Sequence, residues 1–166
     1  IVDKLGGVTI DVKPAEIPAL NSALSELNRL DKESPDSKPV TKSGPQLLNG
    51  KQAVAYARIR KVGHGDYERT ERQRTVMSAL FKKAKSTGVL KLADLVSTVL
   101  PHVETNMSKG EIMSLGMSVM GFRSKDIQQY RLPVDGTFKS QKVRGMAVLV
   151  PDMEKNTDLL HKFIYE

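Results

Sequence analysis

Residues 47–85, LLNGKQAVAYARIRKVGHGDYERTERQRTVMSALFKKAK, determine how the rest of the chain is interpreted. Between about residue 68 and residue 86 the chain has neither Pro nor Gly, and its apolar residues recur at helical spacing. That spacing predicts a long α-helix with a single apolar stripe. The stripe consists of Val76, Met77, Leu80, Phe81 and Ala84.

The same stretch carries most of the positive charge of the chain. From residue 58 to residue 85 there are nine Lys and Arg residues against three acids, and the net charge of the whole chain is +7. Because a helix turns by about 100° per residue, we expect Arg69 and Gln73 to share the apolar face. Arg72 then lies at the edge of that face, and Arg74 points to solvent.

Arginine on the apolar face of the predicted helix indicates a site for an anion. A guanidinium there needs an anionic or hydrogen-bonding partner, because an unpaired buried charge costs about several kcal/mol. Arg69 and Arg72 also lie near the helix N-terminus, where free N–H groups and the helix dipole attract anions. We therefore predict a phosphate site at the start of this helix. The alternative is an internal Arg–Asp pair, for example with Asp66, that only braces the loop.

Arg58 and Arg60 precede the predicted helix and complete the candidate phosphate site. On a helix their side chains would diverge by about 200°, whereas on extended backbone they would point to one side. A phosphate clamp therefore requires extended backbone here, or a preceding helix that ends at about residue 57. Arginine suits this role because its planar fork pairs with two oxygens at once and stays charged. The alternative is a pair of solvated arginines after a helix.

Asp66 lies three residues before Arg69 and has several possible roles. It could align the arginines, hold a water bound to a metal, or assist proton transfer. The structural alternative is a cap for the helix that follows. We assign no metal ligand in this chain, because the three histidines are isolated in the sequence.

The remaining segments predict a mixed α/β fold, with a central β-sheet flanked by helices. Residues 7–12 alternate apolar and polar side chains and are expected to form a strand. A helix at 15–30 follows Pro14, and a Ser-Lys-Gly-Glu capping box opens a helix at 109–121. The other expected elements are a short strand at 40–41, helices at 51–58 and 89–100, strands at 127–133 and 143–150, and a last helix capped by Asp152. The 143–150 strand is nearly all apolar and is therefore expected at the centre of the sheet.

Composition excludes several classes of protein and site. With 166 residues, 39% of them hydrophobic, the chain has the length of one ordinary globular domain. The absence of cysteine excludes disulfides and thiolate chemistry, and no apolar run approaches the roughly 18 residues of a membrane span. Few aromatic residues and no Trp leave little surface for stacking bases. The positive charge suggests a polyanionic partner.

Three motifs in the basic stretch resemble the carboxyl-side signature of the LytR-CpsA-Psr family of bacterial cell-envelope enzymes. They are LNGKQA at 48–53, YARIR at 56–60 and DYERTERQR at 66–74. IVDKLGGVTIDV at 1–12 is similar to the mid-domain strand motif of the same family. The resemblance implies that residues 1–166 are the carboxyl-side portion of a single domain of this family, whose amino-terminal half lies outside this chain.

The resemblance also implies a reaction and the residues that perform it. Enzymes of this family transfer a glycopolymer phosphate from a polyprenyl-pyrophosphate carrier to peptidoglycan. The catalytic set is implied to be Arg58, Arg60, Asp66 and Arg69, and the substrate-binding pair Arg72 and Gln73. Fixed cations suit this chemistry because charge develops on phosphate oxygens when pyrophosphate is cleaved.

Further expectations concern the cofactor, the binding partners and the cellular location of the protein. The resemblance implies Mg²⁺, with ligands outside this chain, and a polyprenyl (pyro)phosphate-linked glycopolymer such as teichoic acid. It implies work at the extracytoplasmic face of the bacterial membrane, reached through a membrane segment absent here. Missing strands should leave a sheet edge unpaired, so we expect a homodimer, a swapped assembly or a loosened core. We expect no turnover by this chain alone.

Two other functions remain possible at this point. The charge cluster could belong to a nucleic-acid-binding regulator of transcription, although nucleic acid is not the expected partner because a DNA reader exposes its basic residues on a recognition face. A non-catalytic module that binds envelope glycans is the second alternative. Salt-dependent duplex binding favours the first, and binding that follows the sugar rather than the phosphate favours the second.

Overall fold

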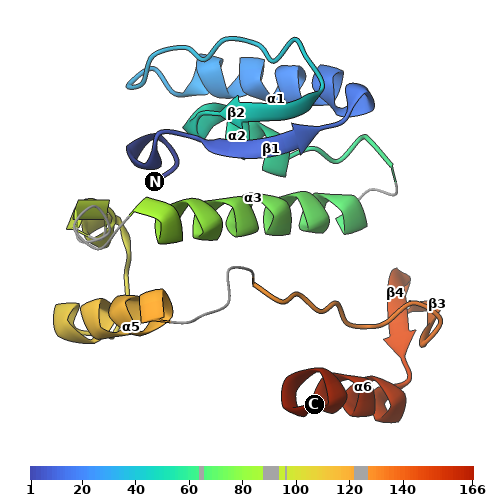
Figure 1. Ribbon diagram of the computed structural model, residues 1–166. Coiled ribbons are helices and arrows are strands. Elements are labelled where there is room, and N and C mark those ends of the chain that lie inside the picture. The colour runs from blue at the N-terminus through green and yellow to red at the C-terminus, as the bar shows by residue number, and fades with distance from the viewer. Residues whose placement is uncertain (64–65, 88–93, 96, 122–126) are drawn as a thin grey trace. The chain divides into compact units, whose positions relative to one another are not determined.

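The computed structural model describes residues 1–63, 66–87, 94–95, 97–121 and 127–166 (Figure 1). They form a mixed α/β chain that divides into two compact units, Ile1–Ile127 and Gln128–Glu166. The fold class expected from the sequence is confirmed. Within the described residues, no helix is both long enough and apolar enough to cross a membrane.

The N-terminal unit contains a two-stranded antiparallel sheet. Strand β1, Val8–Val12, pairs with β2, Gly44–Leu48, and Ile10 lies opposite Gln46. Residues of β1 alternate between buried and exposed, as the period-2 pattern predicts. The strand expected at 40–41 does not form, and β2 begins at Gly44 instead.

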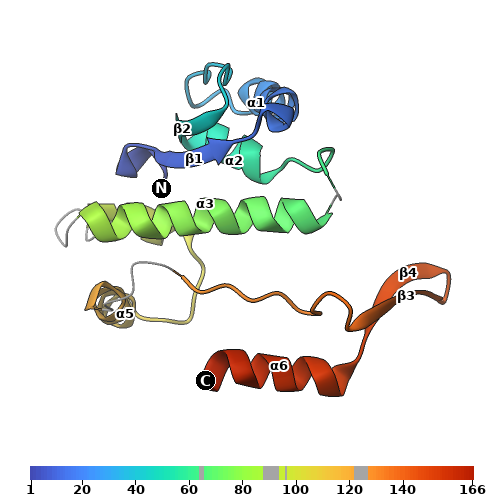
Figure 2. The ribbon, with the colours of Figure 1, turned by 45° about the vertical axis from the view of Figure 1, so that its right-hand side comes forward.

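Three helices surround these strands. Helix α1, Ile17–Leu30, continues from a 3₁₀ turn at Pro14–Glu16. Helix α2, Gly50–Ala57, follows directly after β2, and α3 spans Asp66–Thr87. Figures 1 and 2 show α1 and α3 on opposite sides of a middle layer that contains β1 and α2.

The core of this unit lies where the three helices meet the sheet. Leu20 and Leu24 of α1 have at most 1% of their surface exposed, and Val76 comes from α3. The other members are Val2, Val8, Ile10, Val12, Val40, Leu48, Ala53, Ala55, Tyr56 and Ile59. Burial at about 25 cal/mol per Å² of apolar surface makes this cluster the main source of stability.

Helix α2 begins where its capping residues predict. Asn49 accepts a hydrogen bond from the Gln52 backbone N–H at 3.0 Å, and the Gln52 side chain accepts one from the Asn49 N–H at 2.9 Å. This reciprocal pair is a capping box, in which two otherwise unpaired donors are satisfied. It sets the start of α2 and therefore the position of its end, where Arg58 lies.

Helix α5, Lys109–Gly121, also begins at its expected capping box. The Ser108 backbone N–H donates to the Glu111 carboxylate at 2.8 Å, and the Glu111 backbone N–H donates to the Ser108 hydroxyl at 3.3 Å. Of the helix expected at 89–100, residues 94–95 and 97–99 are helical, and the rest lies largely outside the described residues.

The C-terminal unit is a β-hairpin followed by a helix. Strand β3, Phe138–Val143, pairs antiparallel with β4, Met146–Pro151. The two-residue turn has φ of 51° at Arg144 and 80° at Gly145, and positive values at both positions match the twist of hairpin strands. Helix α6, Met153–Tyr165, is capped by Asp152, which accepts from the Lys155 N–H at 3.1 Å.

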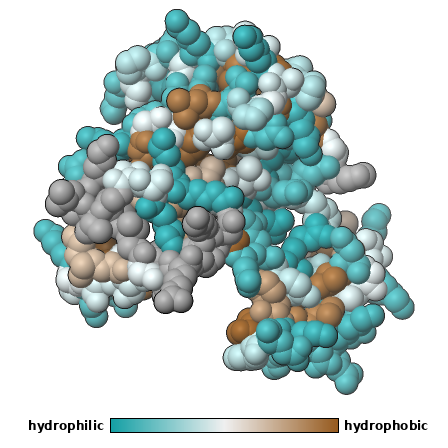
Figure 3. All heavy atoms as spheres, in the orientation of Figure 1, coloured by the Kyte–Doolittle hydropathy of each residue, from teal (hydrophilic) through white to brown (hydrophobic). Residues whose placement is uncertain are grey.

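Two strand predictions in this region need correction. Residues 127–133 contain no strand. The apolar strand starts at Met146 rather than residue 143, and among the described residues it pairs with β3 alone. Its side chains are largely exposed, so the apolar sequence does not place it inside a sheet here. Figure 3 shows apolar side chains on the surface of this unit. Its exposed apolar residues include Met146, Leu149, Val150 and Ile164.

The Asn156 side chain of α6 makes hydrogen bonds to the segment that precedes the hairpin of the C-terminal unit. It is 6% exposed and accepts from the Val134 N–H and from the Thr137 hydroxyl, each at 3.0 Å. Its amide donates to the backbone oxygens of Asp152 at 2.7 Å and Thr137 at 3.3 Å. One side chain therefore joins the helix to the turn before the hairpin.

Candidate functional site

The structure places Arg58 and Arg60 at the end of α2. Helix α2 ends at Ala57, as a phosphate clamp requires, and Arg58 is its C-terminal cap residue. Both arginines are exposed. Arg58 lies 3.5 Å from Glu26 of α1, and both side chains are 47% exposed. Ion pairs this exposed contribute little stability, so Arg58 can exchange this partner for another anion at small cost.

Arg72 is buried, contrary to its expected position at the edge of the helix face. It is 6% exposed, and its Nε donates to Glu16 Oε1 at 2.8 Å. Its other two nitrogens donate to the carbonyls of Ile59 and Val62, each at 3.2 Å. Arg72 thus makes an internal ion pair of the kind left open as an alternative, but with Glu16 rather than Asp66.

The face of α3 that meets the core differs from the expected one. Val76, Ala79 and Leu80 pack into the core, whereas Met77 is 60% exposed. Gln73 is accordingly exposed and Arg69 half-buried, so the prediction that both share the buried face is wrong for Gln73. Asp66 is the first residue of α3, and its side chain lies outside the described part of the chain.

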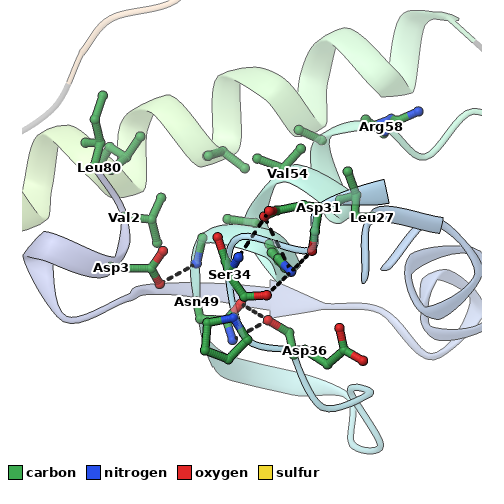
Figure 4. A pocket seen from close by; sticks show the side chains of 18 of the residues that line it. Val2, Asp3, Leu27, Asp31, Ser34, Asp36, Asn49, Val54, Arg58 and Leu80 are labelled. Atoms are coloured by element: carbon green, nitrogen blue, oxygen red, sulfur yellow. Dashed lines mark hydrogen bonds and ion pairs between the residues drawn. The ribbon is translucent and has the colours of Figure 1, made fainter. Parts of the chain in front are cut away.

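A cavity of about 770 Å³ brings Arg58 and Gln73 together. The apolar part of its wall comes from α1, α2 and α3, through Leu27, Val54 and Leu80. Figure 4 shows Arg58 at one end of this pocket and Leu80 at the other, with Val54 between them. A cationic group at one end of an apolar pocket wall suits a ligand with an anionic head and an apolar chain.

The polar side of the same pocket includes Asp3, Asp31 and Asp36, and two of these acids have internal contacts. The Lys51 ammonium donates to the carbonyls of Asp31 and Ser34, each at 3.0 Å, and lies 3.4 Å from the Asp31 carboxylate. Hydrogen bonds from Ser34, with help from Lys51, hold the pKa of Asp31 below its usual range. Asp3 accepts from the Gly50 N–H at 2.8 Å. Asp3 and Asp31 therefore have partners, and Figure 4 shows Arg58 apart from Asp31 and Ser34.

A second cavity of about 320 Å³ contains Arg72 on its wall, together with Glu16 and Tyr56. The substrate-binding pair implied by the sequence is therefore divided, because Gln73 lines the larger pocket and Arg72 the smaller one. Among the residues that the structure describes, no three His, Asp or Glu side chains gather to hold a metal ion. The described side chains thus do not form a Mg²⁺ site.

The sequence did not single out Glu16. One signal was present, because Pro14 occupies the start of a helical turn and Glu16 closes a capping box. Glu16 Oε2 accepts from the Lys13 N–H at 3.0 Å. That signal identifies the cap, but not the contact with Arg72, which lies 56 residues further along the chain.

Because Tyr56 is buried, we expect the folded protein to lose stability at alkaline pH. Burial raises the pKa of Tyr56 from 10.0 to about 12, and the charge of Glu16 adds to the shift. A raised folded-state pKa gives stability that is complete below the unfolded value and is lost as the pH rises through the folded one. We expect the free energy of unfolding to fall between about pH 10 and 12 more steeply than in Tyr56→Phe, in urea titrations at several pH values. Equal slopes for the two proteins would contradict this.

Comparison with known proteins finds one matching family. The model of the LytR_cpsA_psr family matches residues 1–163. The chain is 31% identical over 129 residues to the polyisoprenyl-teichoic acid–peptidoglycan teichoic acid transferase TagV of Bacillus subtilis, covering 76% of this chain and 30% of that protein. It is 33% identical over 100 residues to the regulatory protein MsrR of Staphylococcus aureus, covering 59% of this chain and 30% of that protein.

Solved structures agree with this match. The crystal structure of B. subtilis TagV superposes with a TM-score of 0.63 at 27% identity, covering 97% of this chain and 57% of that one. TagT bound to LIIa-WTA superposes with a TM-score of 0.70 at 23% identity, covering 97% and 54%, and this shows the shared fold. The chain therefore spans about a third of the curated relatives and about half of the solved chains.

Proposed function

Because this chain belongs to the LytR_cpsA_psr family, we propose that it carries part of the phosphate-binding site of a cell-envelope phosphotransferase. The proposed reaction moves a glycopolymer phosphate from a polyprenyl-pyrophosphate carrier to peptidoglycan, at the extracytoplasmic face of the membrane. At the level of the family, the relatives named as teichoic acid transferases support a role in attaching glycopolymers to the cell wall.

One observation carries the proposal. Arg58 and Gln73 come from two different helices and line one cavity whose wall is largely apolar. The guanidinium offers a charged fork for phosphate oxygens, and the apolar wall offers a surface for the first isoprene units. Arg60, which is exposed two positions after Arg58, is proposed to join it, and Arg69 to act from the first turns of α3.

The proposed phosphoryl transfer requires positive charge at fixed positions. When a hydroxyl of the acceptor sugar attacks the phosphorus that bears the glycopolymer, its oxygen forms the new bond and its proton is released to solvent. The bond to the carrier's phosphate breaks, and the polyprenyl phosphate leaves with the electron pair. Arg58 and Arg60 are proposed to stabilise the charge that develops on these oxygens. Loss of a preorganised donor of this kind costs roughly 10²–10³-fold in rate in other enzymes.

Replacing Arg58 with alanine is expected to weaken the binding of farnesyl pyrophosphate, a soluble probe with an isoprene chain and a diphosphate head. A hydrogen bond to a charged group contributes about 1.5–3 kcal/mol, so the dissociation constant should rise about 10- to 100-fold. Calorimetric titration measures this. Arg29→Ala is the matched control, because Arg29 is also an exposed arginine but lies outside the cavity. Unchanged binding in both Arg58→Ala and Gln73→Ala would show that the site is assigned wrongly.

A nucleic-acid-binding regulator is the alternative function. The exposed basic residues Arg58, Arg60 and Lys61 favour it, and one relative is named a regulatory protein. Binding of duplex DNA that weakens steeply with salt, together with no binding of farnesyl pyrophosphate, would support this alternative. Binding to glycan without any requirement for phosphate would instead support a non-catalytic module.

The finer expectations stay proposals. We propose that Mg²⁺ is held by residues outside this chain, that a segment elsewhere attaches the protein to the membrane, and that this chain alone does not turn over substrate. Self-association also stays a proposal. The apolar, exposed strand β4 supports it, because an uncharged edge strand is a template for pairing with another chain.

A further inference from the structure

We infer that Glu16 and Arg72 are positioning residues for the proposed phosphate site, because together they fix the backbone on which Arg58 and Arg60 are mounted. This inference takes the identity of the site from the proposed function, but the contacts that carry it do not depend on that function. It assigns Arg72 a role through other residues rather than a contact with substrate, and it adds Glu16 to the residues that shape the site.

The buried ion pair between Glu16 and Arg72 is called the strut below, and Glu16 forms one end of it. Its side chain is 3% exposed and both of its carboxylate oxygens are used, by the Arg72 Nε at 2.8 Å and by the Lys13 N–H at 3.0 Å. The second bond anchors Glu16 to the turn between β1 and α1. A carboxylate held in this way from two sides gives Arg72 a fixed anionic support.

Arg72 forms the other end and reaches the loop between α2 and α3. Its two terminal nitrogens donate to the carbonyls of Ile59 and Val62, each at 3.2 Å. The Ile59 carbonyl lies in the peptide bond that joins Ile59 to Arg60, and Arg58 is the residue before Ile59. Two bonds from one rigid fork therefore fix the chain on both sides of Arg60.

Arg72 is poorly placed to bind the ligand itself. It is 6% exposed, all three of its nitrogens have partners, and it lines the smaller cavity rather than the one shared by Arg58 and Gln73. Lysine cannot replace it, because a single ammonium lacks the planar fork that reaches a carboxylate and two carbonyls together. Small displacements of positioned groups are costly, so loss of the strut should weaken the site without removing any ligand contact.

The strut can be tested first without any ligand. In Glu16→Gln and in Arg72→Lys, we expect hydrogen exchange of the Arg58 and Ile59 amides, measured by NMR, to become about 10-fold faster relative to the Leu24 amide. Val8→Ala removes buried volume from β1 and controls for general loss of stability. If the ratio of exchange rates stays at its value in the parent chain, the strut does not hold this segment and the inference is overturned.

Binding then shows whether the strut acts through the arginines. Glu16→Gln is expected to weaken the binding of farnesyl pyrophosphate about 10-fold, by analogy with the loss of a supporting contact at metal sites. In a background that carries both Arg58→Ala and Arg60→Ala, the same change should cost about 3-fold or less, because residues that act through one another are not additive. Arg72→Lys should behave in the same way. Equal losses in the parent chain and in this background would mean that the strut acts on the ligand independently of Arg58 and Arg60, which overturns the inference.

The two proposals fail in distinguishable ways. If the parent chain does not bind farnesyl pyrophosphate, the proposed function fails and the positioning role fails with it, although the exchange rates still decide whether the strut holds the loop. If the parent chain binds and both strut variants bind as tightly as Val8→Ala, the positioning role alone is wrong.

Discussion

Replacing Arg72 with alanine is expected to lower the free energy of unfolding of the N-terminal unit by about 3–5 kcal/mol, because it removes one partner of a buried ion pair. Glu16, which is 3% exposed in the parent chain, would lose its cation. The carbonyls of Ile59 and Val62 would lose their donors at the same time. Urea unfolding followed by circular dichroism measures the change.

Two further variants separate this effect from a general loss of charge. Arg74→Ala removes an arginine two positions away that is neither part of the core nor bound to Glu16, and should cost less than about 1 kcal/mol. A double variant with Glu16→Leu and Arg72→Leu should recover much of the stability, since apolar replacement of a buried pair is often neutral. A loss below about 1 kcal/mol in Arg72→Ala would place this pair among ordinary surface ion pairs and refute the expectation.

Replacing Asn156 with alanine is expected to unfold the C-terminal unit while the N-terminal unit stays folded. The change leaves the Val134 N–H without its acceptor, whereas the Thr137 hydroxyl keeps its 2.6 Å hydrogen bond to the Val134 carbonyl. Each orphaned buried group costs about 1–3 kcal/mol. A unit of this size buries little apolar surface and has a small margin of stability.

NMR spectra distinguish local from global unfolding. Amide signals from β3, β4 and α6 should collapse toward random-coil positions, and those of β1 and α3 should persist. Thr157→Ala is the matched control, because Thr157 is the exposed neighbour of Asn156 on the same helix. Retention of dispersed signals from β3 and β4 in Asn156→Ala would mean that the hairpin does not depend on this side chain.

Local signals were enough to predict most of the N-terminal unit. The alternation at residues 8–12, the caps at Pro14 and Asn49, and the long run without Pro or Gly before Thr87 all describe nearest neighbours along the chain. Each element that they predict is present with nearly the expected bounds. The family resemblance and the fold class rest on the same stretch and are confirmed.

Properties that depend on distant contacts could not be predicted. Two adjacent positions on α3, Arg72 and Gln73, differ by one step of helical rotation. Which of them is buried depends on how α3 packs on the core and on the position of Glu16. The apolar run at Met146–Pro151 indicates a strand but not its neighbours, since burial of both faces requires partners from elsewhere. The strand β3 contains two lysines and a glutamine and has little strand signal of its own.

The candidate site was predicted in part. The sequence correctly identified the end of α2 as the place where Arg58 is presented, because capping and helix length are local properties. It could not divide the arginines between the two cavities, because that division depends on how α1, α2 and α3 pack together. The catalytic roles of Arg58, Arg60, Asp66 and Arg69 stay predictions.

The buried position of Arg72 bears on how this protein could be engineered. A mutant library designed to change which ligand the larger cavity accepts should randomise Arg58 and Gln73, which line that cavity, and keep Arg72 and Glu16 constant. Varying all the arginines of the motif together would fill such a library with clones that misfold before they meet a substrate. Screens for soluble expression alone would then discard them without revealing anything about donor choice.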